Sequence, residues 1–198
     1  MLPREEINIP VADGRLLLVR DFYALEEADP LQKTLTEELQ WEARAIKIFG
    51  REVMQPRLVA WYGEREAVYT YSGTTFVPLP FTPTLLQIKQ DIQQYLQAPF
   101  NSMLANLYRN GQDSMGWHSD DEKQLGTNPF IASLSLGEER VFKLRHKSDK
   151  TLKVEVPLPH GSLLVMGGAL QHHWQHQLPK SAKAMQPRIN LTFRWLQP

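Results

Sequence analysis

Apolar and polar positions follow different periods in the two halves of the chain. In about the first 100 residues, the run RLLLVRDF (residues 15–22) predicts a buried strand, and two later segments have apolar residues at helical spacing. From Asn101 onward, apolar residues alternate with polar ones in short runs between turn-forming residues. This alternation is typical of antiparallel strands with one buried face.

Both predicted helices begin with a capping residue followed by proline. In ADPLQKTLTEELQW, Asp29 is the predicted N-cap, Pro30 takes the first helical position and Gln32 closes a capping box. In FTPTLLQIKQDIQQYLQ, Thr82 and Pro83 take the corresponding positions. We expect these helices to be structural.

The second half contains five predicted strands: IASLSLG, RVFKLRHK, TLKVEVPL, GSLLVMGG and RINLTFRWL. In RVFKLRHK, Phe142 and Leu144 alternate with Lys143 and Arg145, and the following KSDK is a predicted hairpin tip. Many short strands without intervening helices predict a mainly β protein with flanking helices (α+β), a sandwich or jelly-roll barrel. No linker is evident, so residues 1–198 are predicted to form one domain.

Composition narrows the possible functions. The 198 residues carry a formal net charge of zero, so nucleic-acid binding would need a local basic patch. The absence of cysteine excludes disulfides, thiolate metal sites and a cysteine nucleophile, and is compatible with the reducing cytoplasm that we expect as location. The N-terminal residues do not resemble a signal peptide, and no apolar run approaches the ~20 residues of a membrane span.

The stretch GWHSDDEK contains two candidate metal ligands. His118 and Asp120 are two residues apart, so in a strand their side chains project from the same face. A third ligand is available in QHHWQHQ from His172, His173 or His176. Two histidines and one carboxylate are the ligands of non-haem Fe(II) oxygenases. The alternative interpretation is an exposed acidic loop beside an edge strand.

The C-terminal stretch PRINLTFRW predicts a strand with a strongly polar face. Arg188, Asn190, Thr192 and Arg194 alternate with apolar residues. Two arginines flanking an amide and a hydroxyl would suit a dicarboxylate, because guanidinium groups bind carboxylates through two hydrogen bonds. The alternative is an ordinary strand whose polar face contacts water.

Five ordered segments, NLYRNGQDSMGWHSDDE, SLSLGEERVFKLRHK, LPHGSLLVMGG, HHWQHQLP and PRINLTFRW, resemble the AlkB family of Fe(II)/2-oxoglutarate-dependent nucleic-acid dealkylases. The resemblance is nearest to members that act on double-stranded DNA. It is strong over residues 101–196 and looser back to about Ile46. It implies a double-stranded β-helix (jelly-roll) catalytic core over about residues 101–198, preceded by helices and a nucleotide-recognition segment.

The resemblance also implies roles for individual residues. His118, Asp120 and His176 would bind Fe(II) and form the catalytic centre, with His176 preferred because it precedes LP in HQLP. The 2-oxoglutarate site would consist of Asn106, Tyr108, Arg188, Asn190, Thr192 and Arg194, and Arg194 would pair with the distal carboxylate. The implied reaction demethylates bases such as 1-methyladenine and 3-methylcytosine with O2 and releases succinate, CO2 and formaldehyde.

Several side chains are candidates for binding a flipped base. In VYTYSG, Tyr69 and Tyr71 match the family's base-stacking strand, although aromatic packing between strands would give the same pattern. Asp121 and Glu122 could favour a cationic methylated base, although a solvated turn would also account for Asp121. Phe49, in KIFGRE, aligns with a hairpin that, in the family members acting on double-stranded DNA, inserts an aromatic wedge into the base stack. The alternative is an ordinary buried Phe.

A basic hairpin is the candidate surface for DNA phosphates. Its cationic residues are Arg140, Lys143, Arg145, Lys147, Lys150 and Lys153. The predicted partner is therefore alkylated DNA, single- or double-stranded, with RNA also considered, and the protein is expected to act as a monomer. Two other functions remain open: a related hydroxylase acting on RNA, a lipid or a small molecule, and a non-catalytic jelly-roll module.

Overall fold

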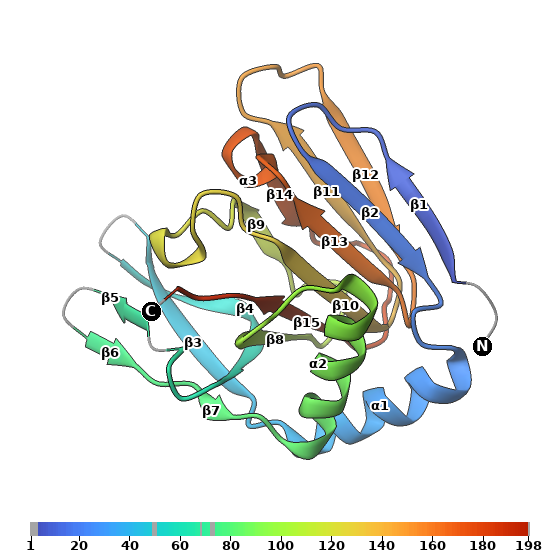
Figure 1. Ribbon diagram of the computed structural model, residues 1–198, viewed down its shortest axis with the longest axis vertical. Helices are drawn as coiled ribbons and strands as arrows, with labels where there is room; N and C mark the ends of the chain where they lie inside the picture. The colour runs from blue at the N-terminus through green and yellow to red at the C-terminus, as the bar shows by residue number, and fades with distance from the viewer. Residues whose placement is uncertain (1–3, 49–50, 68, 72–73, 198) are drawn as a thin grey trace.

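The computed structural model describes residues 4–48, 51–67, 69–71 and 74–197 (Figure 1). Within these residues, the larger sheet has nine strands in the order β1-β2-β13-β10-β15-β8-β4-β3, with β7 beside β4. Its strands are β1 (Glu5–Ile9), β2 (Arg15–Arg20), β3 (Glu42–Ile48), β4 (Arg51–Gly63), β7 (Leu79–Pro80), β8 (Ser102–Tyr108), β10 (Ile131–Gly137), β13 (Leu163–Gly167) and β15 (Arg188–Arg194). All pairings in it are antiparallel except that of β4 with β7.

A smaller antiparallel sheet faces the larger one. Its strands, in order, are β12 (Lys153–Leu158), β11 (Arg140–His146), β14 (Trp174–Leu178) and β9 (Met115–His118). A separate pair is formed by β5 (Tyr69–Tyr71) and β6 (Thr74–Phe76). The two facing sheets form a jelly-roll core, and the predicted mainly β fold with flanking helices is confirmed.

The larger sheet is buried on both faces because each side of it packs against a different layer. In β2, Leu17 and Val19 belong to the core that the sheet shares with the helices. The alternate residues Leu16 and Leu18 belong to the core between the two sheets, which also contains Trp174 of β14. Period-two alternation therefore divides one strand between two cores, and LLLV (residues 16–19) reads as continuously apolar for this reason.

Two long helices cover the outer face of the larger sheet (Figure 1). They are α1 (Leu25–Glu38) and α2 (Pro83–Leu96); the short helical segments are α3 (Leu170–His173) and the 3-10 turn Lys123–Leu125. The predicted start of α2 is confirmed, because the Thr82 side chain accepts a hydrogen bond from the Leu85 amide at 3.2 Å. None of the helices in the described parts of the chain is both long and apolar enough to cross a membrane.

The predicted start of α1 is wrong. The helix begins at Leu25, and Pro30 lies inside it. Its N-cap is Ala24, whose amide donates to the Glu27 carboxylate at 3.1 Å, and this contact starts the helix before the proline. Asp29, the predicted cap, instead lies 3.0 Å from the His160 imidazole.

A candidate metal centre beside an anion-binding pocket

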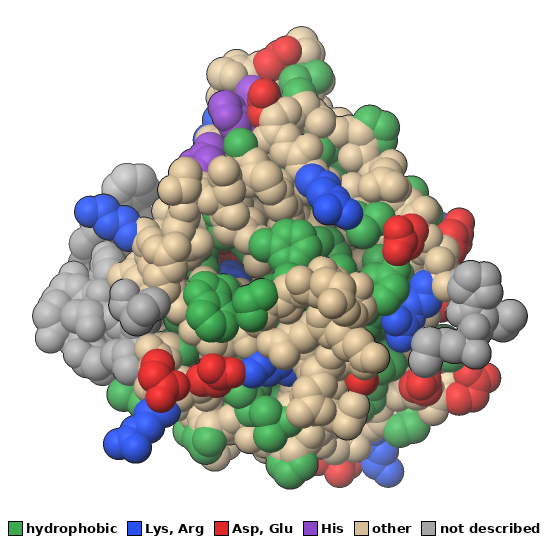
Figure 2. Space-filling view, viewed as in Figure 1, with side chains coloured by type: hydrophobic (Ala, Val, Ile, Leu, Met, Phe, Trp, Pro, Cys, Tyr) green, Lys and Arg blue, Asp and Glu red, His purple; other side chains and the backbone are tan. Residues whose placement is uncertain are grey.

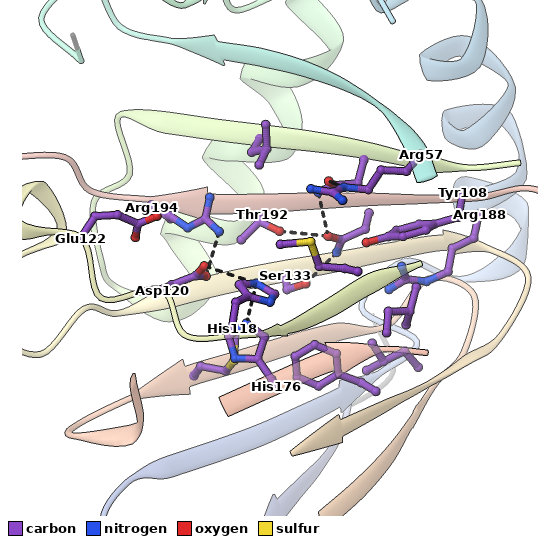
Figure 3. Close-up of a pocket in the computed structure, with 18 residues that line it drawn as sticks. Arg57, Tyr108, His118, Asp120, Glu122, Ser133, His176, Arg188, Thr192 and Arg194 are labelled. Carbon is purple, nitrogen blue, oxygen red and sulfur yellow. Dashed lines mark hydrogen bonds and ion pairs between the residues drawn. The ribbon is translucent and has the colours of Figure 1, made fainter. Parts of the chain in front are cut away.

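A cavity of about 170 Å³ opens between the two sheets. Its apolar wall includes Leu104, Phe142, Leu158 and Met166. Its polar wall includes Arg57, Asn106, Tyr108, His118, Asp120, Glu122, His176, Arg188, Asn190, Thr192 and Arg194 (Figure 3). The cavity therefore brings together the predicted metal ligands and the predicted polar face of the C-terminal strand.

Strand pairing in the smaller sheet assembles the candidate metal ligands. The antiparallel register of β9 and β14 sets His118 opposite His176, with their Nε2 atoms 3.1 Å apart. Asp120 follows β9 directly, and its Oδ1 lies 3.7 Å from His118 Nε2. One ligand atom from each of the three residues lies within 4.8 Å of the others. These distances suit a shared metal ion after small side-chain adjustments.

Hydrogen bonds orient two of these ligands. The Nδ1 atom of His118 lies 2.9 Å from the Gly116 carbonyl, which can only accept, so Nδ1 donates and Nε2 keeps its lone pair for the site. Arg194 donates to Asp120 Oδ2 at 2.8 Å and leaves Oδ1 facing the histidines (Figure 3). The Asp120 amide donates to the buried Gln171 side chain at 2.9 Å.

The surroundings hold His176 and Asp120 in the protonation states that a divalent metal requires. Burial, together with the charge of His118, lowers the pKa of His176 to about 3. Burial alone would raise the pKa of Asp120, but the charges of Arg194 and of the two histidines outweigh burial and lower it. At neutral pH the site therefore contains a carboxylate and a neutral imidazole at His176.

The polar face of β15 is buried. Arg188, Asn190 and Thr192 have relative exposures of 2%, 7% and 6%, so the alternative of a face in contact with water is wrong. Pairing with β8 sets Tyr108 opposite Arg188 and Asn106 opposite Asn190. The six residues predicted for 2-oxoglutarate thus lie on two adjacent strands and line one cavity.

Arg188 is a buried cation with spare hydrogen-bonding capacity. One terminal nitrogen donates to Ser135 Oγ at 2.9 Å, and Nε has no partner among the described residues. Burial lowers the pKa of Arg188 to about 10, so it stays charged at neutral pH. An unpaired donor on a buried guanidinium is costly unless an anionic ligand accepts from it.

The two arginines of β15 lie at opposite ends of the cavity. Arg194 contacts Asp120 at the metal-ligand end, whereas Arg188 lies beside Tyr108 at the other end (Figure 3). This arrangement disagrees with the expectation that Arg194 pairs with the distal carboxylate of 2-oxoglutarate. A carboxylate far from the metal would meet Arg188, because the two arginines are six positions apart along one strand.

Sequence reasoning missed Arg57, a third guanidinium in the cavity. Arg57 lies on β4, has a relative exposure of 6% and donates to Asn106 Oδ1 at 2.7 Å. The available signal was a lone arginine in the apolar stretch PRLVAW. With Arg57, Arg188 and Arg194 against the buried carboxylate of Asp120, the inner cavity favours an anionic ligand.

The candidate base-binding residues fall into four groups. Phe49 lies outside the described residues, and Tyr69 and Tyr71 lie on β5, opposite β6. Exposed Asp121 has an oxygen 3.4 Å from Lys147 Nζ, so it forms part of a surface ion pair. Exposed Glu122 lines the cavity. Glu122 is thus the predicted acidic residue that directly reaches the pocket.

The basic hairpin is less uniformly exposed than predicted. Arg140 has a relative exposure of 3%, and its guanidinium donates to the carbonyls of Asn110, Asp113 and Pro179. The prediction that Arg140 contacts DNA phosphates at the surface is therefore wrong. Arg145 lies over the Trp117 ring at 4.2 Å and donates to Gln175. Exposed Lys150 and Lys153 remain the freely accessible cations of this hairpin.

The protein is similar to known oxygenases in sequence and in fold. Residues 15–194 match the family model described as the 2OG-Fe(II) oxygenase superfamily. The structure titled "The structure of OsALKBH1" superposes with a TM-score of 0.68 over 96% of this chain and 100% of that chain, at 16% identity, and so shares the fold. The protein is a 2-oxoglutarate-dependent dioxygenase, and its family uses Fe(II).

Curated relatives narrow the class. The chain is 45% identical over 198 residues to "Alpha-ketoglutarate-dependent dioxygenase alkB homolog 3" of Bos taurus, covering 96% of this chain and 68% of the relative. The Homo sapiens counterpart is 43% identical, covering 98% and 70%. "DNA oxidative demethylase ALKBH2" of Homo sapiens is 39% identical over 178 residues, covering 85% and 68%. The chain belongs to the AlkB family, as the sequence motifs predicted.

Proposed function

We propose that this dioxygenase oxidatively demethylates N-alkylated bases in DNA, of the 1-methyladenine and 3-methylcytosine type. The observation that carries the proposal is the group of half-buried His118 and buried Asp120 and His176 beside a cavity with three guanidinium groups. A metal and an anionic co-substrate would both find ligands there. The relative named as a DNA oxidative demethylase supports DNA as the substrate.

His118, Asp120 and His176 would hold Fe(II), since two imidazoles and one carboxylate leave coordination positions open. Arg188 would bind the distal carboxylate of 2-oxoglutarate, with Tyr108, Asn106, Asn190 and Thr192 along its length. The bound metal, with 2-oxoglutarate and O2, supplies the oxidation that hydroxylates an N-methyl carbon and yields succinate, CO2 and, after the carbinol breaks down, formaldehyde.

The protein's own residues would position and shield this chemistry. Arg194 holds the Asp120 carboxylate in place, and the Gly116 carbonyl holds the His118 ring, so ligand geometry is set before the metal binds. Phe142 and Met166 line the cavity and limit access of water to the reacting carbon.

A base in a duplex cannot reach a cavity between two sheets, so the target nucleotide would have to leave the stack. Tyr69, Tyr71 and Glu122 are the proposed contacts for a flipped cationic base, and Asp121, Arg145 and a Phe49 wedge are further candidates from the sequence. We also propose that residues 1–198 work as one domain and as a monomer. The alternative function is hydroxylation or demethylation of RNA or of a non-nucleic-acid substrate by the same centre.

The test is product release from defined oligonucleotides. Purified protein with Fe(II) and 2-oxoglutarate is given 1-methyladenine or 3-methylcytosine in single-stranded DNA, duplex DNA and RNA, with unmethylated oligonucleotides and the Asp120→Ala variant as controls. We expect formaldehyde and succinate in about equal amounts, from methylated DNA only. The proposal would be contradicted if succinate formed but none of these oligonucleotides released formaldehyde. Faster turnover of RNA than of DNA would favour the alternative function, demethylation of RNA.

A further inference from the structure

A second group of metal-ligand side chains lies outside the cavity. Asp13 in the turn between β1 and β2, His146 at the end of β11 and His173 at the end of α3 each offer one ligand atom, and these atoms lie within 4.8 Å of one another. None of the three residues lines the cavity described above. Figure 2 shows histidine and acidic side chains together at the top of the molecule, where Figure 1 has α3 and the hairpin tips.

His146 supplies an independent sign that a ligand belongs here. The residue has a relative exposure of 5%, yet its Nε2 has no hydrogen-bond partner in the described parts of the chain. The nearest carboxylate oxygen, Asp13 Oδ2, is 3.3 Å away but does not complete a hydrogen bond. Buried polar atoms are normally paired, so an unpaired imidazole nitrogen aimed at a carboxylate needs an explanation.

The backbone around the group is already held in place. The Trp174 indole donates to the Ala12 carbonyl at 2.8 Å, which fixes the turn carrying Asp13. The Lys147 amide donates to the His173 carbonyl at 2.7 Å, and the His146 and His173 rings stack at a centroid distance of 5.8 Å. Among the three ligands, the exposed side chains of Asp13 and His173 are the ones that would rotate to reach a common ion.

We propose that Asp13, His146 and His173 form a second site for a divalent transition metal of the Zn²⁺ type. Two imidazoles with one carboxylate match the ligand preference of Zn²⁺, whereas Ca²⁺ and Mg²⁺ require mainly oxygen ligands. The ion would join the turn between β1 and β2, at the edge of the larger sheet, to the ends of β11 and β14 in the smaller sheet. Its role is structural, because it connects elements outside the cavity.

Binding requires a change of tautomer at His146. In the metal-free protein, Nδ1 accepts from the Asp149 amide at 3.1 Å, and the ring proton is therefore on Nε2. A metal at Nε2 moves this proton to Nδ1, where Ser148 Oγ, also 3.1 Å away, can accept it while the Asp149 amide turns to water. Loss of the hydrogen bond from the Asp149 amide lowers the affinity of the site for the metal. A hydrogen bond from Nδ1 to Ser148 offsets part of this loss, so Ser148 is a supporting residue of the site.

The experiment counts ions in full-length, metal-free protein by calorimetric titration with Zn²⁺, and checks ligand geometry from the visible spectrum with Co²⁺. Wild type should bind two ions per chain, and a His118→Ala/Asp120→Ala variant should bind one. In that background, Asp13→Asn and His173→Ala should each weaken the remaining site at least tenfold, and Ser148→Ala by about tenfold. His172→Ala, which removes a neighbouring exposed histidine, should leave it unchanged.

Melting curves separate ligand loss from misfolding. Zn²⁺ should raise the melting temperature of the His118→Ala/Asp120→Ala variant, and adding Asp13→Asn or His173→Ala should remove this rise without lowering the melting temperature in the absence of metal. No ion bound to the His118→Ala/Asp120→Ala variant, or equal affinity in the Asp13→Asn, His173→Ala and His172→Ala variants of that background, would overturn the second site. These readouts do not depend on catalytic activity, so a failure of the proposed function would leave them unaffected.

Discussion

Among the described residues, two groups of two histidines and one aspartate lie in different surroundings. In the first, the side chain of Asp120 is 6% exposed and bonded to Arg194. In the second, the side chain of Asp13 is 52% exposed, and only His146 is buried. The same ligand types therefore occur at a site that opens into a cavity and at a site that joins surface turns.

The difference shows that ligand identity alone does not indicate catalysis. His118, Asp120 and His176 face a cavity that is lined by guanidinium groups and by apolar side chains. Asp13, His146 and His173 lie beside Trp174 and the hairpin tips. Reactivity requires space for substrates next to the metal, and the first group lines such a cavity.

The largest expected effect separates the two aspartates. Asp120→Ala should reduce demethylation by more than ~100-fold, since even supporting residues of a metal site cost 10–100-fold when lost. Asp13→Ala should keep turnover. Formaldehyde release and iron content are the measurements, with a melting curve to confirm folding. Iron-loaded, fully active Asp120→Ala protein would exclude Asp120 as a ligand.

The next test separates the three neighbouring histidines. His176→Ala should be as inactive as Asp120→Ala, because His176 is the one that pairs with His118 across β9 and β14. His172→Ala and His173→Ala should retain iron-dependent activity, since both residues are exposed on α3. Should His172→Ala prove inactive instead, the assignment of the third ligand is wrong.

Acid should destabilise the metal-free protein through the first group. In the folded state, burial lowers the pKa of His176 to about 3, against about 6.5 in the unfolded chain. Between these pH values the unfolded state binds more protons, so stability falls as pH falls. One such group predicts a loss of about 2 kcal/mol in unfolding free energy between pH 7.5 and pH 5.

Urea denaturation at the two pH values measures this loss. The His176→Gln variant should show a smaller pH dependence, because it removes the titrating group. His173→Ala, in the second group, should behave like wild type, since that histidine is exposed. Equal pH dependence in wild type and His176→Gln would show that other groups dominate acid sensitivity.

The smallest effect concerns the arginines of β15. Arg188→Lys should weaken 2-oxoglutarate binding about tenfold or more, because one charged hydrogen bond contributes ~1.5–3 kcal/mol, and it should leave iron binding unchanged. Arg194→Lys should instead weaken iron binding, because the 2.8 Å contact with Asp120 is lost. Titrations of both ligands test this, and an unchanged 2-oxoglutarate requirement in Arg188→Lys would place the dicarboxylate elsewhere.

Much of the fold was predictable because alternation within a strand is a local property. The alternation in residues 140–158 and 188–194 predicted antiparallel strands with one apolar face, and the structure has β11, β12 and β15 there. The start of α1 was missed because proline is favoured in the first turn of a helix, and Pro30 was therefore assigned to that turn. In the structure, Ala24 and Glu27 cap the helix earlier in the chain, and Pro30 lies inside it. The position of Arg57 in the cavity depends on the pairing of β4 with β8, which no local pattern reveals.

The sequence by itself determined the sets of side chains that share one strand or one short turn: His118 with Asp120, and Arg188, Asn190, Thr192 and Arg194 together. Tertiary structure decided how these sets meet. The register of β9 and β14 brings His176, rather than His172 or His173, to His118, and the course of β15 takes Arg194 to Asp120 while Arg188 lies beside Tyr108. The reason is physical: side-chain direction along a strand follows from backbone geometry over two residues, whereas register between distant strands depends on the packing of the whole core.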